Sequence, residues 1–210
     1  NCQWLGSVYR WLHDQLAALP LEPSVRADLF GWMDAQAARV PPGSGGAFGL
    51  LGPILMDVQA FFVVRPGMFL FPPPAHPLSD APSGVPHLLR SALENFAFAL
   101  RGNLERLRST GRGEPDRIRI TGGMAASPLF CQILSDCMDK PVEVAAVLEG
   151  SALGAAVCAA AGVKAFGGIR EAQQALVRKD RCYEPAKEVH ETYSLVYERW
   201  LELYRKQEDL

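Results

Sequence analysis

The sequence lacks long hydrophobic runs and any excess of charge of one sign. No apolar stretch reaches the roughly 18 residues that a membrane-spanning helix needs, because proline, glycine or charged residues interrupt the longest ones. Lysine and arginine number 21 against 23 aspartates and glutamates, so the net charge is −2. Domains that bind a polyphosphate backbone are usually strongly basic. The sequence therefore predicts neither a membrane protein nor a nucleic-acid-binding domain.

Cysteine is scarce, and its spacing matches no metal site. The five cysteines include no Cys-x-x-Cys, and the four histidines have no ligand spacing. Cys131, Cys137 and Cys158 fall in predicted helices among small or apolar neighbours, which favours buried, reduced thiols over a catalytic or metal-binding role. Reduced thiols in turn predict a cytoplasmic protein.

The composition is that of an ordinary globular protein. Apolar residues make up 49% of the 210 residues and charged residues 21%, which suffices for a sizeable core. The chain opens with Asn-Cys-Gln-Trp, without an initiator methionine or a signal peptide. We therefore expect its first residue to be a cut edge.

Hydrophobic periodicity predicts two helices and two short strands in the first third of the chain. The first helix is expected over 7–19, and the second continues from Ser24, as its N-cap, to about Ala38. A stretch rich in proline and glycine then ends the second helix. Short strands are expected at 47–51 and 67–71.

From the middle of the chain onwards, helices alternate with strands. The long helix 86–107 carries an apolar stripe, which is typical of a helix packed against a sheet. Strands are predicted at 116–121 and 141–147, and a helix follows each of them. This order predicts an α/β fold with parallel neighbouring strands. The later predicted helices are 128–138, 149–161, 168–178 and 187–205.

Two of these helices have faces of unusual composition. In helix 149–161, Gly150, Gly154 and Cys158 lie four residues apart on one face, which predicts very close packing on a neighbour. The last helix, 187–205, is amphipathic and gathers most of its aromatic residues on one side. That side carries Tyr193, Val196, Tyr197, Trp200 and Tyr204.

The most informative stretch is Thr121-Gly122-Gly123-Met124-Ala125-Ala126-Ser127-Pro128. Two glycines between a strand and a helix permit a sharp turn and let a ligand approach without meeting a Cβ. The first amides of the helix that Ser127 caps favour a phosphate or ribose oxygen. The spacing fits neither Gly-x-Gly-x-x-Gly nor a P-loop, so a mere tight turn and a nucleotide cradle both stay open.

Other candidate residues are isolated. Glu149 stands at a helix start, where exposed amides favour a carboxylate, so a capping role is expected. Asp57 lies in an apolar stretch and is a candidate substrate ligand or turn former. No Ser-His-Asp arrangement or Gly-x-Ser-x-Gly is visible.

Four linked motifs resemble the C-terminal domain of the FGGY carbohydrate kinases. They are Gly-Gly-x-x-x-Ser at 122–127, Gln-x-x-x-Asp at 132–136, Pro-Val at 141–142 and Glu-x-x-Ala-Leu-Gly-Ala-Ala at 149–156. The resemblance implies a ribonuclease H-like, actin-like ATPase fold, with a mixed sheet flanked by helices. Residues 1–210 would form the C-terminal domain of a two-domain kinase, with 186–210 as a final helix packed on it.

The family transfers the terminal phosphate of ATP to a sugar or polyol hydroxyl, in a cleft between two domains. By resemblance to glycerol kinase, a member, Gly123 and Ser127 contact the nucleotide, and Gly122 is the first glycine of the same pair. Gly6 and Arg10, in the motif Gly-x-x-x-(Gln/Arg)-Trp, are implied contacts as well. The resemblance thus implies ATP and Mg²⁺ as cofactors, the N-terminal domain of the same protein as partner, and a homodimer as an option.

The resemblance places the catalytic base of the family upstream of Asn1, together with the N-terminal phosphate loop and the first strands of the second domain. We therefore expect no catalytic residue in this chain, and no kinase activity from the chain alone. Two alternatives remain: a non-catalytic actin-like nucleotide-binding module, and an interaction domain that has lost its nucleotide.

The region expected to contact the sugar departs from most of the family. Most members carry Gly-Glu-Arg-x-Pro-x-Trp between the two short strands. This region is more similar to the autoinducer-kinase branch, which carries Met-Asp-x-x-x-Trp-x-His-x-x-Pro. Met56, Asp57 and Pro66 match that pattern, whereas Phe61 replaces its Trp and Val63 replaces its His. Asp57 is the candidate substrate residue, and the identity of the sugar stays open.

Overall fold

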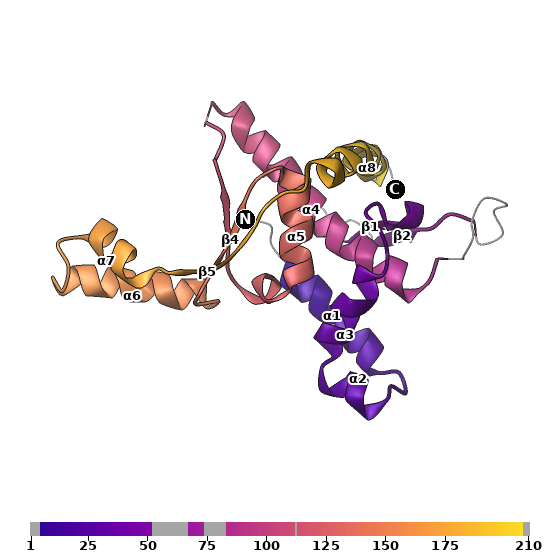
Figure 1. Cartoon of the computed structure of the whole chain (residues 1–210), viewed down its shortest axis with the longest axis horizontal. Coiled ribbons are helices and arrows are strands. Elements are labelled where there is room, and N and C mark those ends of the chain that lie inside the picture. Colours follow the sequence, from indigo (N-terminus) through magenta and orange to yellow (C-terminus); the bar gives the residue numbers. More distant parts are fainter. Residues whose placement is uncertain (1–4, 52–66, 74–82, 112, 208–210) are drawn as a thin grey trace.

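Strands and helices alternate along the second half of the chain, as the sequence predicts (Figure 1). The structure is a computed structural model, and it describes residues 5–51, 67–73, 83–111 and 113–207. Its elements, in order, are α1 (Leu5–Ala17), α2 (Pro23–Ala27), α3 (Leu29–Ala38), η1 (Ser44–Gly46), β1 (Phe48–Leu50), β2 (Met68–Leu70), α4 (Val85–Ser109), β3 (Ile118–Ile120), η3 (Gly123–Ala126), α5 (Pro128–Met138), β4 (Val142–Ala145), α6 (Gly150–Gly162), α7 (Ile169–Leu176), β5 (Lys179–Tyr183) and α8 (Lys187–Lys206).

The larger sheet is mixed, with the strand order β3-β4-β5. β3 and β4 are parallel, with Ile118 opposite Val142, which confirms the predicted parallel neighbours. β5 adds to the other side of β4 in the antiparallel direction and was not predicted. Its sequence, Lys-Asp-Arg-Cys-Tyr, alternates between exposed and half-buried positions and has no apolar run to indicate a strand.

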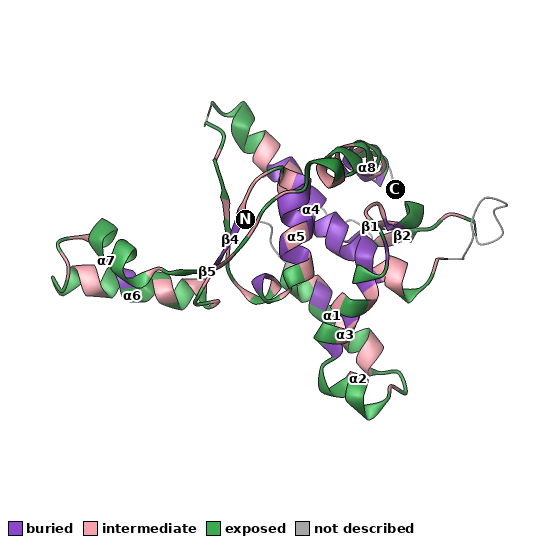
Figure 2. Cartoon of the chain, in the orientation of Figure 1, coloured by how far each residue is buried: buried purple, intermediate pink, exposed green. Residues whose placement is uncertain are grey.

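The core lies around α4, which α3, α5 and β1 contact (Figure 2). Leu93, Phe96 and Ala97 of α4 are fully buried. The apolar stripe does not stay buried to its end, because Leu107 is 37% exposed. Figure 1 shows the reason, since the last turns of α4 project beyond the helices that cover the rest of it. In α5 the predicted buried face is confirmed; its members are Phe130, Ile133, Leu134 and Cys137.

The C-terminal helix α8 packs against α5 and α4. Tyr193, Tyr197, Trp200 and Tyr204 are buried, as the amphipathic pattern predicts. The indole of Trp200 donates a hydrogen bond of 3.1 Å to the backbone oxygen of Gly49. α8 therefore holds β1, which pairs with β2 in a separate antiparallel hairpin at the predicted positions.

The helix predicted from Ser24 to Ala38 is in fact two helices that meet at Asp28. The Asp28 carboxylate accepts a 3.0 Å hydrogen bond from the amide of Gly31 and caps α3, so the side chain competes with a continuous helix. Ser24 is not an N-cap, because α2 begins one residue earlier, at Pro23. A proline at the first helical position needs no amide partner, and this favours the earlier start.

Helices α6 and α7, between β4 and β5, form an arm; they pack on each other and stand away from the rest of the chain (Figure 1). Close packing of α6 is found at Gly150 alone, where a Cβ would lie 2.5 Å from the side chain of Thr121. A Cβ at Gly154 would meet nothing within 4 Å, and Cys158 is exposed, so both predictions for these residues are wrong. Glu149 is the N-cap residue of α6, but its side chain makes no capping hydrogen bond.

Cys131 and Cys137 are buried, as predicted, and burial raises the pKa of Cys131 to about 11. Within the described ranges, no helix combines the length and the hydropathy that a membrane crossing would require.

Candidate functional site

A cavity of about 460 Å³ brings the two predicted nucleotide segments together. Gly6 and Arg10 line it from α1, and Gly123 and Ser127 line it from the turn after β3. Gly6 and Arg10 lie more than a hundred residues before Gly123 and Ser127 in the sequence, so only the fold places them in one site. Asp57, the predicted substrate residue, lies outside the described residues. The rest of the lining consists of Tyr9, Asp28, Phe30, Gly31, Asp34, Met124, Ala126 and Pro128.

The two glycines have different roles in the turn. Gly122 has a φ of +92°, which residues with a Cβ rarely adopt, and its amide donates to the backbone oxygen of Leu148 at 2.8 Å. Gly122 does not line the cavity, and it turns the chain from β3 into η3. Gly123 does line the cavity, and a Cβ there would meet no atom within 4 Å. The space beside Gly123 is therefore open to a ligand.

Ser127 lies where η3 ends and α5 begins. It is the N-cap of α5, and its Oγ accepts a 3.0 Å hydrogen bond from the amide of Phe130. A hydroxyl that accepts one hydrogen bond can still donate its own proton. The site thus offers a ligand one hydroxyl donor beside the N-terminus of an eleven-residue helix.

The opposite wall is aromatic, and sequence reasoning did not identify it. The guanidinium of Arg10 lies over the ring of Phe30, 5.2 Å from its centroid, and Tyr9 stacks on the same ring at 5.8 Å. Phe30 is 37% exposed, so part of its ring faces the cavity. An exposed phenylalanine in a helix is common, so the sequence held no signal for this role.

Tyr9 also makes a part-buried hydrogen bond. Its hydroxyl donates to the Asp34 carboxylate at 2.9 Å. Burial, and then the negative charge of Asp34, raise the pKa of Tyr9 far above its usual range. The hydroxyl therefore stays protonated and fixes Asp34 at the edge of the cavity.

The charge of the cavity suits a nucleoside better than a triphosphate. Among the described residues that line it, Arg10 carries the only positive charge, against the carboxylates of Asp28 and Asp34. Carboxylates and hydroxyls bind ribose hydroxyls and amino groups, whereas a triphosphate needs several cations or a metal ion. In the described ranges, no three His, Cys, Asp or Glu side chains are grouped to hold a metal ion.

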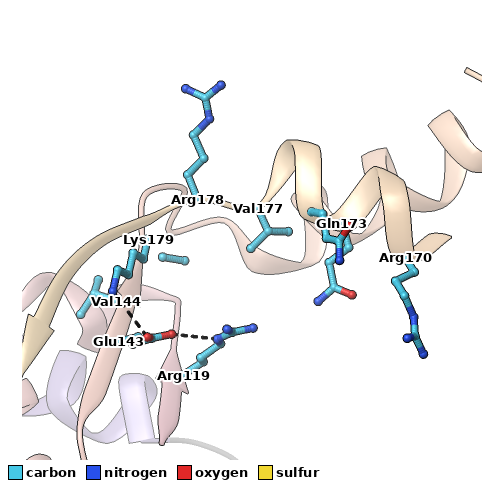
Figure 3. A pocket seen from close by; sticks show the side chains of 10 residues that line it. Arg119, Glu143, Val144, Arg170, Gln173, Val177, Arg178 and Lys179 are labelled. Carbon is cyan, nitrogen blue, oxygen red and sulfur yellow. Dashed lines mark hydrogen bonds and ion pairs between the residues drawn. The ribbon is translucent and has the colours of Figure 1, made fainter. Parts of the chain in front are cut away.

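A second cavity, of about 520 Å³, lies between α7 and the sheet (Figure 3). The Glu143 carboxylate in it accepts hydrogen bonds from Arg119 at 3.0 Å and from Arg117 at 2.8 Å. Lys179 completes the ion cluster at 3.7 Å. The hydrogen bonds from Arg119 and Arg117 lower the pKa of Glu143, so it stays ionised and compensated. This arrangement fits an ion-pair cluster and not a catalytic acid.

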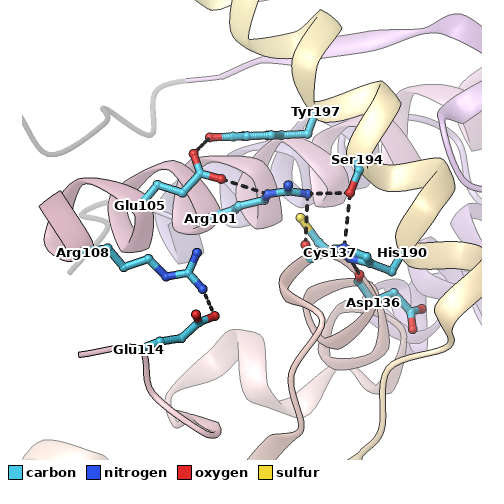
Figure 4. Close-up of polar contacts among 9 residues, drawn as sticks. All are labelled: Arg101, Glu105, Arg108, Glu114, Asp136, Cys137, His190, Ser194 and Tyr197. Carbon is cyan, nitrogen blue, oxygen red and sulfur yellow. Dashed lines mark hydrogen bonds and ion pairs between the residues drawn. The ribbon is translucent and has the colours of Figure 1, made fainter. Parts of the chain in front are cut away.

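A third polar cluster joins α4, α5 and α8 (Figure 4). The Arg101 guanidinium donates to Glu105 at 3.1 Å, to the backbone oxygen of Cys137 at 3.3 Å and to Ser194 at 3.3 Å. Burial raises the pKa of the Cys137 thiol to about 12, so this cysteine is a poor nucleophile. The cluster links three helices, and the His190 ring is hydrogen-bonded within it to Ser194 and to the backbone oxygen of Asp136.

Comparison with known proteins points to one family. The family described as "FGGY family of carbohydrate kinases, C-terminal domain" matches residues 1–163. The autoinducer-2 kinase of Escherichia coli K12 is 30% identical over 206 residues, which cover 96% of this chain and 37% of that protein. The autoinducer-2 kinase of Salmonella paratyphi B is also 30% identical, over 98% of this chain and 38% of that protein.

Solved structures show the same fold. The xylulose kinase of Rhodospirillum rubrum superimposes with a TM-score of 0.75 and 29% identity, over 97% of this chain and 38% of that structure. The glycerol kinase of Plasmodium falciparum, solved with ADP, gives a TM-score of 0.69 at 20% identity, over 95% of this chain and 37% of that structure. At 20% identity the second match speaks for the fold alone.

Proposed function

This chain belongs to the FGGY family of carbohydrate kinases, as its C-terminal, actin-like domain, and we propose that it supplies the ATP-binding half of an enzyme that phosphorylates a sugar or polyol hydroxyl. The chain spans 37% or 38% of the curated relatives it matches, so the activity of the whole protein is part of the proposal. The observation that carries it is the single cavity formed by Gly6, Arg10, Gly123 and Ser127.

The proposal assigns each wall of the cavity a task. The open space beside Gly123 admits the nucleoside, and the Ser127 hydroxyl donates to it. Phe30 and Arg10 form a flat wall against which an adenine ring can stack. ATP would supply the phosphoryl group, and this half of the enzyme would bind and orient it.

The described residues do not fit Mg²⁺ or a catalytic base. Among them, no three His, Cys, Asp or Glu side chains lie close enough together to hold a metal ion. The carboxylates of Asp28 and Asp34 already accept hydrogen bonds from Gly31 and Tyr9. Phosphoryl transfer needs a base for the sugar hydroxyl and cations for the phosphate. We therefore assign both tasks to an N-terminal domain on the other side of the cleft.

We propose that residues 1–210 form the C-terminal domain of a cytoplasmic enzyme, with α8 (Lys187–Lys206) as its last helix among the described residues. We propose Asp57 as a sugar contact, because 56–66 resembles the autoinducer-kinase branch. The named relatives phosphorylate autoinducer-2, which makes a related sugar the first substrate to test. A homodimer stays a prediction.

Calorimetric titration of ATP tests the nucleotide site directly. Gly123→Val places a branched side chain in the open space, and in the full-length protein we expect it to weaken ATP binding about a hundredfold or more, which is a few kcal/mol. Ser127→Ala should cost about 1 kcal/mol, as for one neutral hydrogen bond. The matched control is Gly162→Val, since a Cβ there also meets nothing within 4 Å but lies far from the cavity. Unchanged ATP affinity in a folded Gly123→Val variant would contradict the assignment.

A coupled ADP-release assay over a panel of pentoses, polyols and related sugars tests the division of labour. The isolated chain should show no sugar-dependent turnover, since loss of a base alone slows such reactions about 10²–10⁴-fold. When the chain is joined to an N-terminal domain of the family, the protein should release ADP in the presence of its sugar substrate. Turnover by the isolated chain would show that catalytic residues lie within it. ATP binding without turnover by the joined protein on any sugar would favour the non-catalytic, actin-like alternative.

A further inference from the structure

Positive charge gathers around the cavity of about 520 Å³ between α7 and the sheet (Figure 3). Four cations and one acid line it, although the whole chain carries a net charge of −2. A hollow lined by charges of one sign concentrates their field and attracts ions of the opposite sign. The cations are Arg119 of β3, Arg170 of α7, Arg178, between α7 and β5, and Lys179 of β5, and the acid is Glu143 of β4.

Three cations share the single acid of this cavity. The Glu143 carboxylate accepts hydrogen bonds from Arg117 and Arg119 and lies 3.7 Å from the ammonium of Lys179. One carboxylate balances one cation, so Glu143 leaves an excess of positive charge in this group. Toward the described residues, Arg119 bonds through its Nε alone. The two terminal nitrogens of its guanidinium therefore remain for a ligand.

Arg170 adds a further cation on the opposite side of the cavity. Within the ranges that the structure describes, its side chain forms no hydrogen bond or ion pair. The neighbouring acid, Glu171, directs its carboxylate to the amide of Gly167 at 2.7 Å and so does not compensate Arg170. Figure 3 shows Arg170 on the α7 side of the cavity, whereas the side chain of Arg178 points away from Glu143. Arg170 is thus the cation that α7 offers to an anion.

The neutral part of the lining suits hydroxyl groups. Gln173 and Gln174 of α7 line the cavity, and a side-chain amide both donates and accepts hydrogen bonds, as a hydroxyl does. Cavities that bind small molecules measure about 300–1,000 Å³, and this one is within that range. The cavity therefore combines cations on two sides with amide groups between them, and it has room for a small metabolite.

We propose that this cavity binds a small polyhydroxy compound that carries a phosphate monoester, with its phosphate between Arg119, Arg170 and Lys179 and its hydroxyls at the two glutamine amides. A phosphate monoester carries a charge of about −1.5 to −2 near pH 7, so it matches this excess of cations better than one carboxylate does. Guanidinium groups also present paired N–H donors that fit phosphate oxygens. No lining residue is shared with the cavity of Gly6, Arg10, Gly123 and Ser127, so the inference does not rest on the proposed function.

Calorimetric titration of ribose 5-phosphate into the full-length protein tests the proposal. We expect a Kd of about 1 mM or tighter, no binding of ribose, and at least about fivefold weaker binding of inorganic phosphate. Arg170→Gln removes a cation without breaking an ion pair among the described residues, and it should weaken ribose 5-phosphate binding at least about fivefold. Arg199→Gln in α8 is the matched control, because it makes the same change of charge at a distant exposed position.

Hydrogen exchange locates the bound ligand. Ribose 5-phosphate should slow exchange at residues 169–179 of the parent protein and of the Arg199→Gln variant, and much less so in Arg170→Gln. Residues 123–128, in the wall of the nucleotide cavity, should not respond. Protection at 123–128 instead of 169–179 would place the ligand in the nucleotide cavity and overturn the proposal.

Three further results would contradict it. Equal binding of ribose 5-phosphate by the parent and by folded Arg170→Gln would remove the phosphate contact. Equal affinity for inorganic phosphate and ribose 5-phosphate would remove the polyhydroxy part of the ligand. A loss of ATP affinity in Arg170→Gln would assign the cation to the nucleotide, whereas we expect ATP affinity to stay unchanged. The ATP titration therefore also separates failure of this proposal from failure of the nucleotide site.

Discussion

α8 and α6 show opposite relations between composition and environment. α8 is rich in charged residues, and it buries the aromatic side that its sequence predicts. α6 is uncharged and should be the more buried of the two, but it is mostly exposed. The difference lies in their packing partners. α8 packs against α4, α5 and β1, and all three elements belong to this chain.

This comparison shows what a sequence pattern can predict about packing. A pattern indicates which face of a helix needs cover, and it does not say which polypeptide provides the cover. For α8 the cover comes from the same chain. For α6 the described residues provide little cover, and Val157 is its one buried position.

The largest expected effect in this comparison is at Trp200. Its indole is fully buried, stacks on Tyr204 at 5.2 Å and donates to Gly49 and Asn95. Trp200→Ala should lower the free energy of unfolding by about 3–5 kcal/mol, measured by urea unfolding followed by circular dichroism. Leu195→Ala on the same helix is the control, since Leu195 is 72% exposed, and it should change stability by less than about 0.5 kcal/mol. A loss of stability below about 1 kcal/mol in Trp200→Ala would show that α8 is not part of the core, and α8 and α6 would then no longer differ in burial.

Glu143, on the sheet beside the arm, should give a smaller effect that depends on pH. Its pKa in the folded chain is lowered from the usual 4.5 by hydrogen bonds from Arg119 and Arg117. Folding thus favours the ionised form of Glu143. Its contribution to the free energy of unfolding is therefore present above about pH 4.5, and it is lost as the pH falls through the lowered pKa of the folded state. Glu143→Gln should therefore be less stable than the parent near pH 7, and the gap between their urea midpoints should close in acid.

The control for this prediction is Glu202→Gln, in which an exposed ion pair with Arg199 is lost. Surface pairs of this kind contribute little. A gap between the Glu143→Gln variant and the parent that stays constant from pH 7 to pH 3 would show that Glu143 acts through packing and not through its charge.

Much of the fold was predictable because its signals are local. The alternation after residue 116 and the apolar face of α5 follow from spacing alone, and both are confirmed. The break at Asp28 was missed because a side-chain cap competes with a helix on nearly equal terms. β5 was missed because an edge strand needs few apolar residues.

The candidate site was predictable only in part. The glycine pair and Ser127 have a recognisable pattern, whereas Gly6 and Arg10 came from resemblance alone. Phe30 carried no signal, because its place beside Arg10 depends on how α3 packs against α1. The sequence thus predicted the backbone part of the site better than its aromatic wall.

The smallest expected effect tests the other side of the comparison. Ala155 of α6 is exposed, and glutamine is nearly as good a helix former as alanine, so Ala155→Gln should change the stability of the isolated chain by less than about 0.5 kcal/mol. Val157→Ala, at the one buried position of α6, should cost about 1–2 kcal/mol in the same urea titration. If Ala155→Gln instead costs about 2 kcal/mol or more, then α6 is buried within the isolated chain. In that case α6 and α8 both have their partners within this chain, and the contrast between them disappears.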